Sequence, residues 1–185
     1  MAQATYPSLI PLMAVAVSLL AVPLIVASSR NSTLREIWTL AAAVIKFCLV
    51  FSLLPLALSG RIAETTLLDI APGMGLTFRA DACGVFFALV ASFLWIVTSL
   101  YSIGYVRGAN EKHQTRYFAS FAVCLSATAG IAFAANLPTF IIFYELLTVA
   151  TYPLVIHKEN EEFFTDTTTT QIYTKVSQER LWDVY

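Results

Sequence analysis

Residues 138–153 read PTFIIFYELLTVATYP, an apolar run that carries one charged residue, Glu145, near its centre. A helix of about 20 mainly apolar residues crosses the roughly 30 Å hydrocarbon core of a bilayer. Extended to residue 156, this run meets that length within the error of its ends. Four earlier runs also qualify, and they lie at residues 8–28, 37–58, 82–106 and 117–135. Because unpaired backbone groups are costly in lipid, the sequence predicts an all-α, polytopic membrane bundle of five transmembrane helices.

The composition agrees with a membrane protein and excludes several classes of function. Of the 185 residues, 58% are hydrophobic and 12% are charged, whereas soluble domains carry about 25% charge. The net charge is -1 and the basic residues form no patch, which excludes a nucleic-acid partner. Three cysteines, Cys48, Cys83 and Cys124, share no metal-ligand spacing. We therefore expect no metal, no cofactor and no catalytic site in this chain.

Lysines and arginines outside the spans set the expected orientation. The side with the N-terminus, the 59–81 loop and the Asn136-Leu137 turn carries Arg61 and Arg79. The opposite side carries eight basic residues: Arg30, Arg35, Arg107, Lys112, Arg116, Lys158, Lys175 and Arg180. The positive-inside rule places that second side in the cytoplasm. The N-terminus, which lacks the basic residues of a cleaved signal peptide, is expected to be retained and to lie outside, with the C-terminus inside.

Two parts are expected along the chain. Residues 1–156 form the five-helix transmembrane domain, and residues 157–185 form a charged, threonine-rich cytoplasmic tail without a sixth span. The end of this tail fits a short amphipathic helix or a strand equally well.

The fourth and fifth spans are predicted to form an antiparallel hairpin. Asn136 followed by Pro138 has the pattern of a helix start, because asparagine caps free backbone N–H groups and proline is tolerated in the first turn. Small residues along the fourth span would allow close helix contact, and they are Ala122, Ser126, Ala127, Gly130 and Ala134. We expect this helix to lie inside the bundle.

Glu145 is the main candidate for a functional residue. It is the eighth of 19 residues in its span, about 10 Å from the outer boundary at ~1.5 Å per residue. Acids at this depth usually face a bundle interior or a water cavity, and they mark ion or proton paths. Thr148 and Tyr152 follow at i+3 and i+7 and share its helical face. They would orient the carboxyl or hold water, or else the hydroxyls bond to their own backbone and have no further role.

Lys46 is the second charge expected in mid-membrane, where a lysine costs roughly 2.5 to 3.5 kcal/mol. Three arrangements would offset this cost: a direct or water-mediated pair with Glu145, extension of the side chain to the membrane surface, or a pair with another subunit. His157, at the cytoplasmic end of the fifth span, would suit the transfer of protons, or it is a solvated helix end. Arg79, Asp81 and Arg107 are expected to be interfacial anchors.

Two longer stretches together resemble a known family. Residues 72–108 end their apolar run in YSIGY, and residues 116–159 contain FYELLTVATYPLV. In this order and spacing they resemble the antiporter-like subunits of complex I (NADH-quinone oxidoreductase) and of multisubunit, Mrp-type sodium/proton antiporters. The resemblance implies a multi-pass protein of the bacterial cytoplasmic (inner) membrane in which Glu145 belongs to a buried charge relay. Its expected partners are other membrane subunits, the lipid bilayer, and protons or sodium ions.

Members of that family have about fourteen helices and a functional lysine in the seventh. The resemblance here ends near Glu162, so we expect a truncated, five-helix N-terminal part with an unrelated tail at residues 163–185. One hypothesis is a subunit of a proton- or cation-translocating complex that is inactive alone. The other is a truncated paralogue with a structural or accessory role in a larger respiratory or photosynthetic complex. At most, the chain is a subunit of a redox or antiporter complex, and it is not a membrane enzyme by itself.

Overall fold

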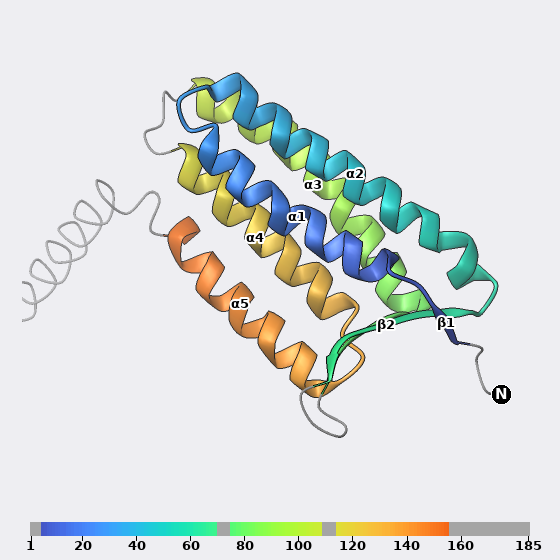
Figure 1. Ribbon diagram of the computed structural model, residues 1–185. Coiled ribbons are helices and arrows are strands. Elements are labelled where there is room, and N and C mark those ends of the chain that lie inside the picture. Colours follow the sequence, from blue (N-terminus) through green and yellow to red (C-terminus); the bar gives the residue numbers. More distant parts are fainter. Residues whose placement is uncertain (1–4, 70–74, 109–113, 156–185) are drawn as a thin grey trace, which may run out of the picture.

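A computed structural model describes residues 5–69, 75–108 and 114–155. Within these residues the helices run side by side, and a small sheet crosses one end of the bundle (Figure 1). In chain order the elements are β1 (Thr5–Pro7), α1 (Ile10–Ala27), α2 (Ser32–Leu58), β2 (Ile62–Asp69), β3 (Gly75–Ala80), α3 (Ala82–Gly108), α4 (Gln114–Ala132) and α5 (Leu137–Val155). The N-terminal strand, the end of α2 and the start of α5 all lie at the sheet end.

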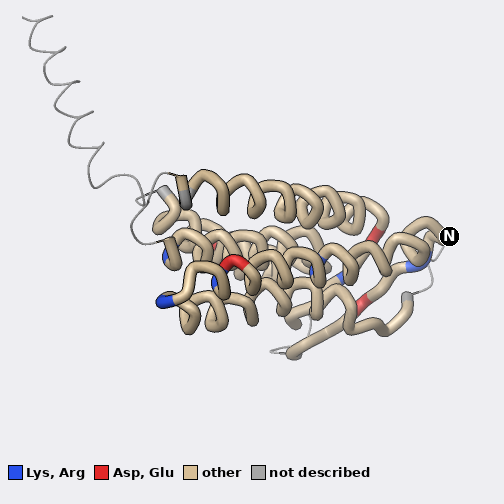
Figure 2. The backbone as a smooth tube through the Cα atoms, turned by 90° about the horizontal axis from the view of Figure 1, so that it is seen from above, with Lys and Arg blue, Asp and Glu red and all other residues tan. Residues whose placement is uncertain are grey.

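Four of the described helices, α1, α2, α3 and α5, are long and apolar enough to cross a membrane. This finding agrees with the expected membrane protein, and most of the tube between the two ends of the bundle is uncharged (Figure 2). The fourth expected span falls on α4, which is not among these four helices. It packs against α1, α3 and α5, and its residues Ala122, Ser126 and Ala127 are fully buried. The prediction that α4 lies inside the bundle is therefore confirmed, whereas five membrane spans are not.

The start of α2 corrects the expected boundary of the second span. The helix begins at Ser32 rather than near residue 37, so Arg35 belongs to the helix and is buried. Its Nη1 donates to the Thr115 hydroxyl at 3.1 Å, and its guanidinium lies 5.4 Å from the centre of the Phe118 ring. Arg35 is therefore not the loop charge that was expected, but joins the start of α2 to the start of α4.

The sheet corrects the expectation of an all-α fold with a loop at residues 59–81. β1 pairs with β2 in parallel, and β2 pairs with β3 in antiparallel register from Ala63↔Ala80 to Asp69↔Gly75. In β3, buried Phe78 and Ala80 flank the exposed Arg79. Such alternation is typical of a half-buried strand. The sheet places this face on the end of the helix bundle, where Phe78 is only 1% exposed.

The turn between α4 and α5 is attached to the free edge of β3. The N–H of Arg79 donates to the carbonyl of Phe133 at 2.7 Å, and the N–H of Ala135 donates to the carbonyl of Thr77 at 3.0 Å. The Oδ1 atom of Asn136 accepts the N–H of Thr139 at 3.0 Å, which confirms the predicted cap. The sheet therefore connects three parts of the chain: the N-terminal strand, the α2–α3 connection and the α4–α5 turn.

The predicted α4–α5 hairpin is present, and it is tightly packed at one point. A Cβ atom on Gly130 of α4 would lie 2.2 Å from the Phe143 ring of α5, so only glycine fits there. The same ring contacts Phe78 of β3 edge-on, with 5.6 Å between the ring centres. α5 is the least buried of the four apolar helices, and its packing is mainly with α4 and β3. Its opposite flank is open.

Candidate functional site

Lys46 lies in the middle of α2 and points into the bundle, where its side chain is only 2% exposed. Its Nζ atom donates to the Ser18 hydroxyl of α1 at 3.0 Å and to the Leu125 carbonyl of α4 at 2.7 Å. The same atom lies 5.4 Å from the centre of the Trp95 ring of α3. Residues of four helices therefore meet at this ammonium group.

The partners of Lys46 within the described residues are neutral. Two of its three N–H donors are used by a hydroxyl and a carbonyl, and the face of an indole ring adds a cation–π attraction. A narrow gap between α3 and α4, without room for a water molecule, is lined by Lys46, Ala91, Thr128 and Ala129. These neutral partners stabilise the ammonium less than a carboxylate partner would. A buried charge without a counter-charge keeps much of its desolvation cost.

Glu145 lies on the outer flank of α5 and its side chain is exposed. It does not face the bundle interior, as an acid in a relay within one chain would. The structure does not bring Glu145 and Lys46 together: Lys46 faces the interior formed by α1 to α4, and α5 packs mainly against the outside of α4 and β3. Neither side chain forms an ion pair within residues 5–69, 75–108 and 114–155.

Thr148 and Tyr152 share the open face of Glu145, as their spacing predicts. The Thr148 hydroxyl donates to the carbonyl of Tyr144 at 3.0 Å, four residues earlier in the same helix. This is the local backbone bond that has no role beyond the helix itself. Tyr152 is 66% exposed. The two hydroxyls therefore do not form a polar chamber around Glu145 with other described residues.

The remaining candidates lie at the ends of the helices. His157 is outside the described residues, and so is the side chain of Arg107. Arg79 is exposed on β3, where it stands opposite Glu64 of β2. Asp81 caps α3, because its Oδ1 atom accepts the N–H of Gly84 at 2.7 Å. This cap gives Asp81 a structural role that its position alone did not reveal.

A set of buried polar side chains on one face of α3 was not predicted from the sequence. They recur at helical spacing, and they are Ser92, Trp95, Ser99 and Ser102. The Ser92 hydroxyl donates to the Leu89 carbonyl, and Ser102 is 3.3 Å from the Tyr117 hydroxyl of α4. The i, i+3, i+7, i+10 pattern was visible in the sequence. Single serines in an apolar run gave no reason to connect them.

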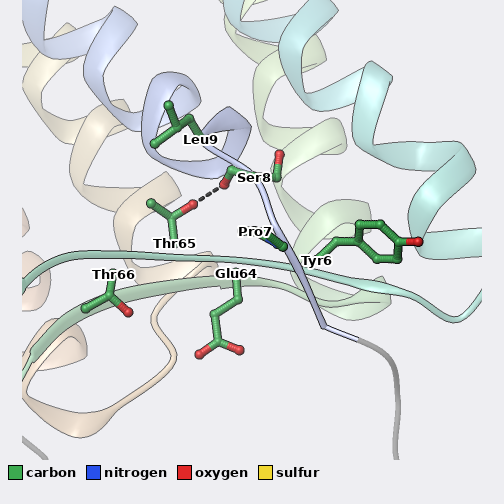
Figure 3. Close-up of a pocket in the computed structure, with 7 residues that line it drawn as sticks. All are labelled: Tyr6, Pro7, Ser8, Leu9, Glu64, Thr65 and Thr66. Carbon is green, nitrogen blue, oxygen red and sulfur yellow. Dashed lines mark hydrogen bonds between the residues drawn. The ribbon is translucent and has the colours of Figure 1, made fainter.

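A second feature, at the sheet end, is an open groove of about 550 Å³ between β1, the start of α1 and β2. Figure 3 shows the residues that line it, with the Thr65 hydroxyl donating to the carbonyl of Ser8. The Glu64 carboxylate points away from the β1 segment. Glu64 is the only charged residue among the described residues that line the groove, so its walls do not form a cluster of charged groups.

No model of a known protein family matches the sequence.

Proposed function

We propose that this chain is a membrane subunit of a proton- or cation-translocating complex and that it is inactive alone. The observation that carries this proposal is the place of Glu145: mid-way along an apolar helix, on a flank that no described element covers. The resemblance to antiporter-like subunits, which places Glu145 in a charge relay, supports the same function. It also supports a location in the bacterial cytoplasmic membrane.

A carboxylate at this depth is costly if it faces lipid, so transmembrane acids usually face protein or a water-filled cavity. In the isolated chain the face around Glu145 is apolar and aromatic, with Ile141, Tyr144 and Val149 all strongly exposed. A transmembrane helix of a partner subunit would cover this face. That helix would carry a lysine, an arginine or a hydroxyl to satisfy the carboxyl group.

A second function, a structural or accessory subunit, is favoured by the surroundings of Lys46. Its ammonium is held by Ser18 and Leu125 within the bundle, and it does not reach Glu145. The two intramembrane charges thus form no relay within the described residues. In this case Glu145 would fix the position of the chain in the assembly and would carry no protons.

A variant of Glu145 separates the two functions. The partner complex is isolated through a tagged copy of this chain, reconstituted into vesicles, and assayed for proton and sodium flux. Glu145→Gln keeps the size and hydrogen bonding of the side chain but cannot release a proton. We expect flux to fall at least about tenfold with the assembly intact, because loss of a proton-transferring group typically costs about 10²- to 10⁴-fold in rate. The control, Thr148→Val, lies on the same face and should leave flux unchanged.

Intact assembly with unchanged flux in Glu145→Gln would reject the translocation role and support the accessory one. Recovery of the chain as a lone monomer would contradict both.

A further inference from the structure

Two buried polar groups of α3 have no hydrogen-bond partner within the described residues: the indole Nε1 of Trp95 and the hydroxyl of Ser99. Trp95 is 1% exposed and Ser99 is 0% exposed. They lie four residues apart, and side chains at this spacing are neighbours on one face of a helix. Buried polar groups are almost always satisfied, and an isolated one costs about 1–3 kcal/mol. Two neighbouring groups of this kind point to a shared ligand.

Water fits the chemistry of this pair. The indole N–H only donates, and a serine hydroxyl both donates and accepts. One water molecule can accept from Trp95 and bond to Ser99, and buried waters typically make about three hydrogen bonds. A third partner is within the same neighbourhood, because the Lys46 ammonium lies over the Trp95 ring and has one donor left after Ser18 and Leu125.

From this pair, polar side chains continue towards the end of the bundle where α2 and α4 begin. We define the polar row as Ser102, Ser99, Trp95 and Lys46. Ser102 follows Ser99 by three residues and meets the Tyr117 hydroxyl, one turn inside the end where α4 begins. Arg35 and Thr115 join α2 to α4 at that same end. The row therefore runs from the end where α2 and α4 begin to the middle of the bundle.

On the sheet side of Lys46, the narrow gap lined by Ala91, Thr128 and Ala129 has no volume that a water molecule could enter. The hydroxyls of Ser126 and Ser92 are both bonded to backbone carbonyls, those of Val15 and Leu89. A core of packed apolar side chains lies between this level and the sheet, and it includes Val50, Leu53, Phe78, Val85 and Phe133. Apolar side chains offer no hydrogen-bond partners to a water molecule.

We propose that bound water connects the members of the polar row, and that this hydrated row opens only at the end of the bundle where α2 and α4 begin. It ends at the Lys46 ammonium. The proposal concerns the interior of α1 to α4 and does not depend on Glu145 or on a partner subunit. It therefore stands or falls separately from the proposed function.

Cysteine substitution along α3 tests the row. Cys48, Cys83 and Cys124 are first replaced by alanine, and Ser99→Cys and Ser92→Cys are then made singly. Both serines are buried on the same face of α3, on either side of the level of Trp95. Membrane vesicles are treated with silver ion, which is hydrated and small, from one side or the other. The thiols that remain unblocked are counted with a fluorescent maleimide after denaturation.

We expect the thiol of Ser99→Cys to be blocked from the side where α2 begins, at least about tenfold faster than that of Ser92→Cys, because a thiol in a sealed core reacts only through local opening. Equal rates at the two positions, or faster reaction of Ser99→Cys from the sheet side, would overturn the proposal.

A second measurement uses the unsubstituted protein and does not depend on tolerance of the cysteines. The indole proton of Trp95 should exchange with deuterated water, followed by NMR, faster than the backbone N–H of Ser92. Exchange as slow as that of Ser92 would contradict a water contact at Trp95.

Discussion

Lys46 is a cation in an apolar bundle whose described partners are all neutral. Removing one partner of a buried charge pair is strongly destabilising, but replacing a poorly compensated charge by an apolar group of similar volume is often neutral or stabilising. The volume of the Lys46 side chain and its charge should therefore contribute differently to the stability of the fold. A substitution that removes the charge but keeps the volume of the side chain separates the two contributions.

Lys46→Met keeps most of the volume and removes the charge, whereas Lys46→Ala removes both. We expect Lys46→Met to change the free energy of unfolding by less than about 1.5 kcal/mol, in the range of volume-conserving changes. We expect Lys46→Ala to lower it by about 2 kcal/mol or more, through the cavity it leaves. Denaturant unfolding of the purified protein in lipid nanodiscs measures both. Equal destabilisation by the two variants would show that the ammonium itself holds the bundle together.

The sequence located the charged site residues but not their surroundings. Lys46 and Glu145 stand out because each is a charge in an apolar run, and the helical period correctly placed Glu145, Thr148 and Tyr152 on one face. Whether a face points inward depends on which helices are neighbours. For α5 the neighbour is α4 on one side only. The partners of Lys46, a serine on α1 and a carbonyl on α4, come from contacts that are distant in sequence.

At the scale of elements, the start of α5 is stabilised by its cap and by the sheet. Asn136 accepts the N–H of Thr139 and its Nδ2 donates to the carbonyl of Gly75. Asn31, at the same position before α2, makes no side-chain cap bond. Asn136 and Asn31 thus occupy equivalent positions, but only Asn136 forms a capping hydrogen bond.

We expect Asn136→Ala to lower the free energy of unfolding by about 1–2 kcal/mol, the usual cost of losing a cap, while Asn31→Ala changes it by less than about 0.5 kcal/mol. Thermal unfolding followed by circular dichroism compares the two variants. Similar losses in both would mean that the bonds of Asn136 contribute little.

The α4–α5 contact gives a second test at this scale. Gly130→Ala places a methyl group against the Phe143 ring, and such overpacking typically costs about 1–3 kcal/mol. Phe143→Leu in the same chain frees space, so the double variant should lose less than the sum of the two single variants. Unfolding measurements on all four proteins form a double-mutant cycle. Additive losses would show that the two residues do not meet.

The helices were predictable and the strands were not, for a physical reason. Apolar runs of membrane length are a strong local signal, and α1, α2, α3 and α5 lie within about two residues of their expected ends, except that α2 begins earlier. β2 and β3 pair with each other, but a two-stranded hairpin alone is at best marginally stable in water. The outer edges of these strands pair with β1 and with the α4–α5 turn. Both of these partners are distant along the chain, so the short alternation in residues 75–80 did not predict a sheet.

At the scale of the whole molecule, the bundle has two different ends. One is covered by the sheet, and at the other α1 joins α2 and α5 ends. The distribution of lysines and arginines predicts that the sheet end lies outside the cytoplasm. This orientation has a direct experimental test.

In a background without native cysteines, Thr66→Cys on β2 and Ser29→Cys after α1 place exposed thiols at opposite ends. We expect a membrane-impermeant maleimide to label Thr66→Cys in intact cells and Ser29→Cys only after the membrane is opened. The reverse pattern would show that the positive-inside rule gives the wrong orientation for this chain. Labelling of both positions from one side would contradict the bundle as a membrane-crossing unit.

The parallel pairing of β1 with β2 has a consequence for biosynthesis. During synthesis β1 emerges first, but its partner strand, β2, follows only after α1 and α2. The hydrogen bonds that join Phe133 and Ala135 to β3 form only after α4 is complete. The ribosome therefore delivers α1 to α4 before the sheet and its contacts with the α4–α5 turn can be completed, since contacts between distant segments form late. Completion of the sheet is expected to mark the moment at which the nascent bundle stops rearranging.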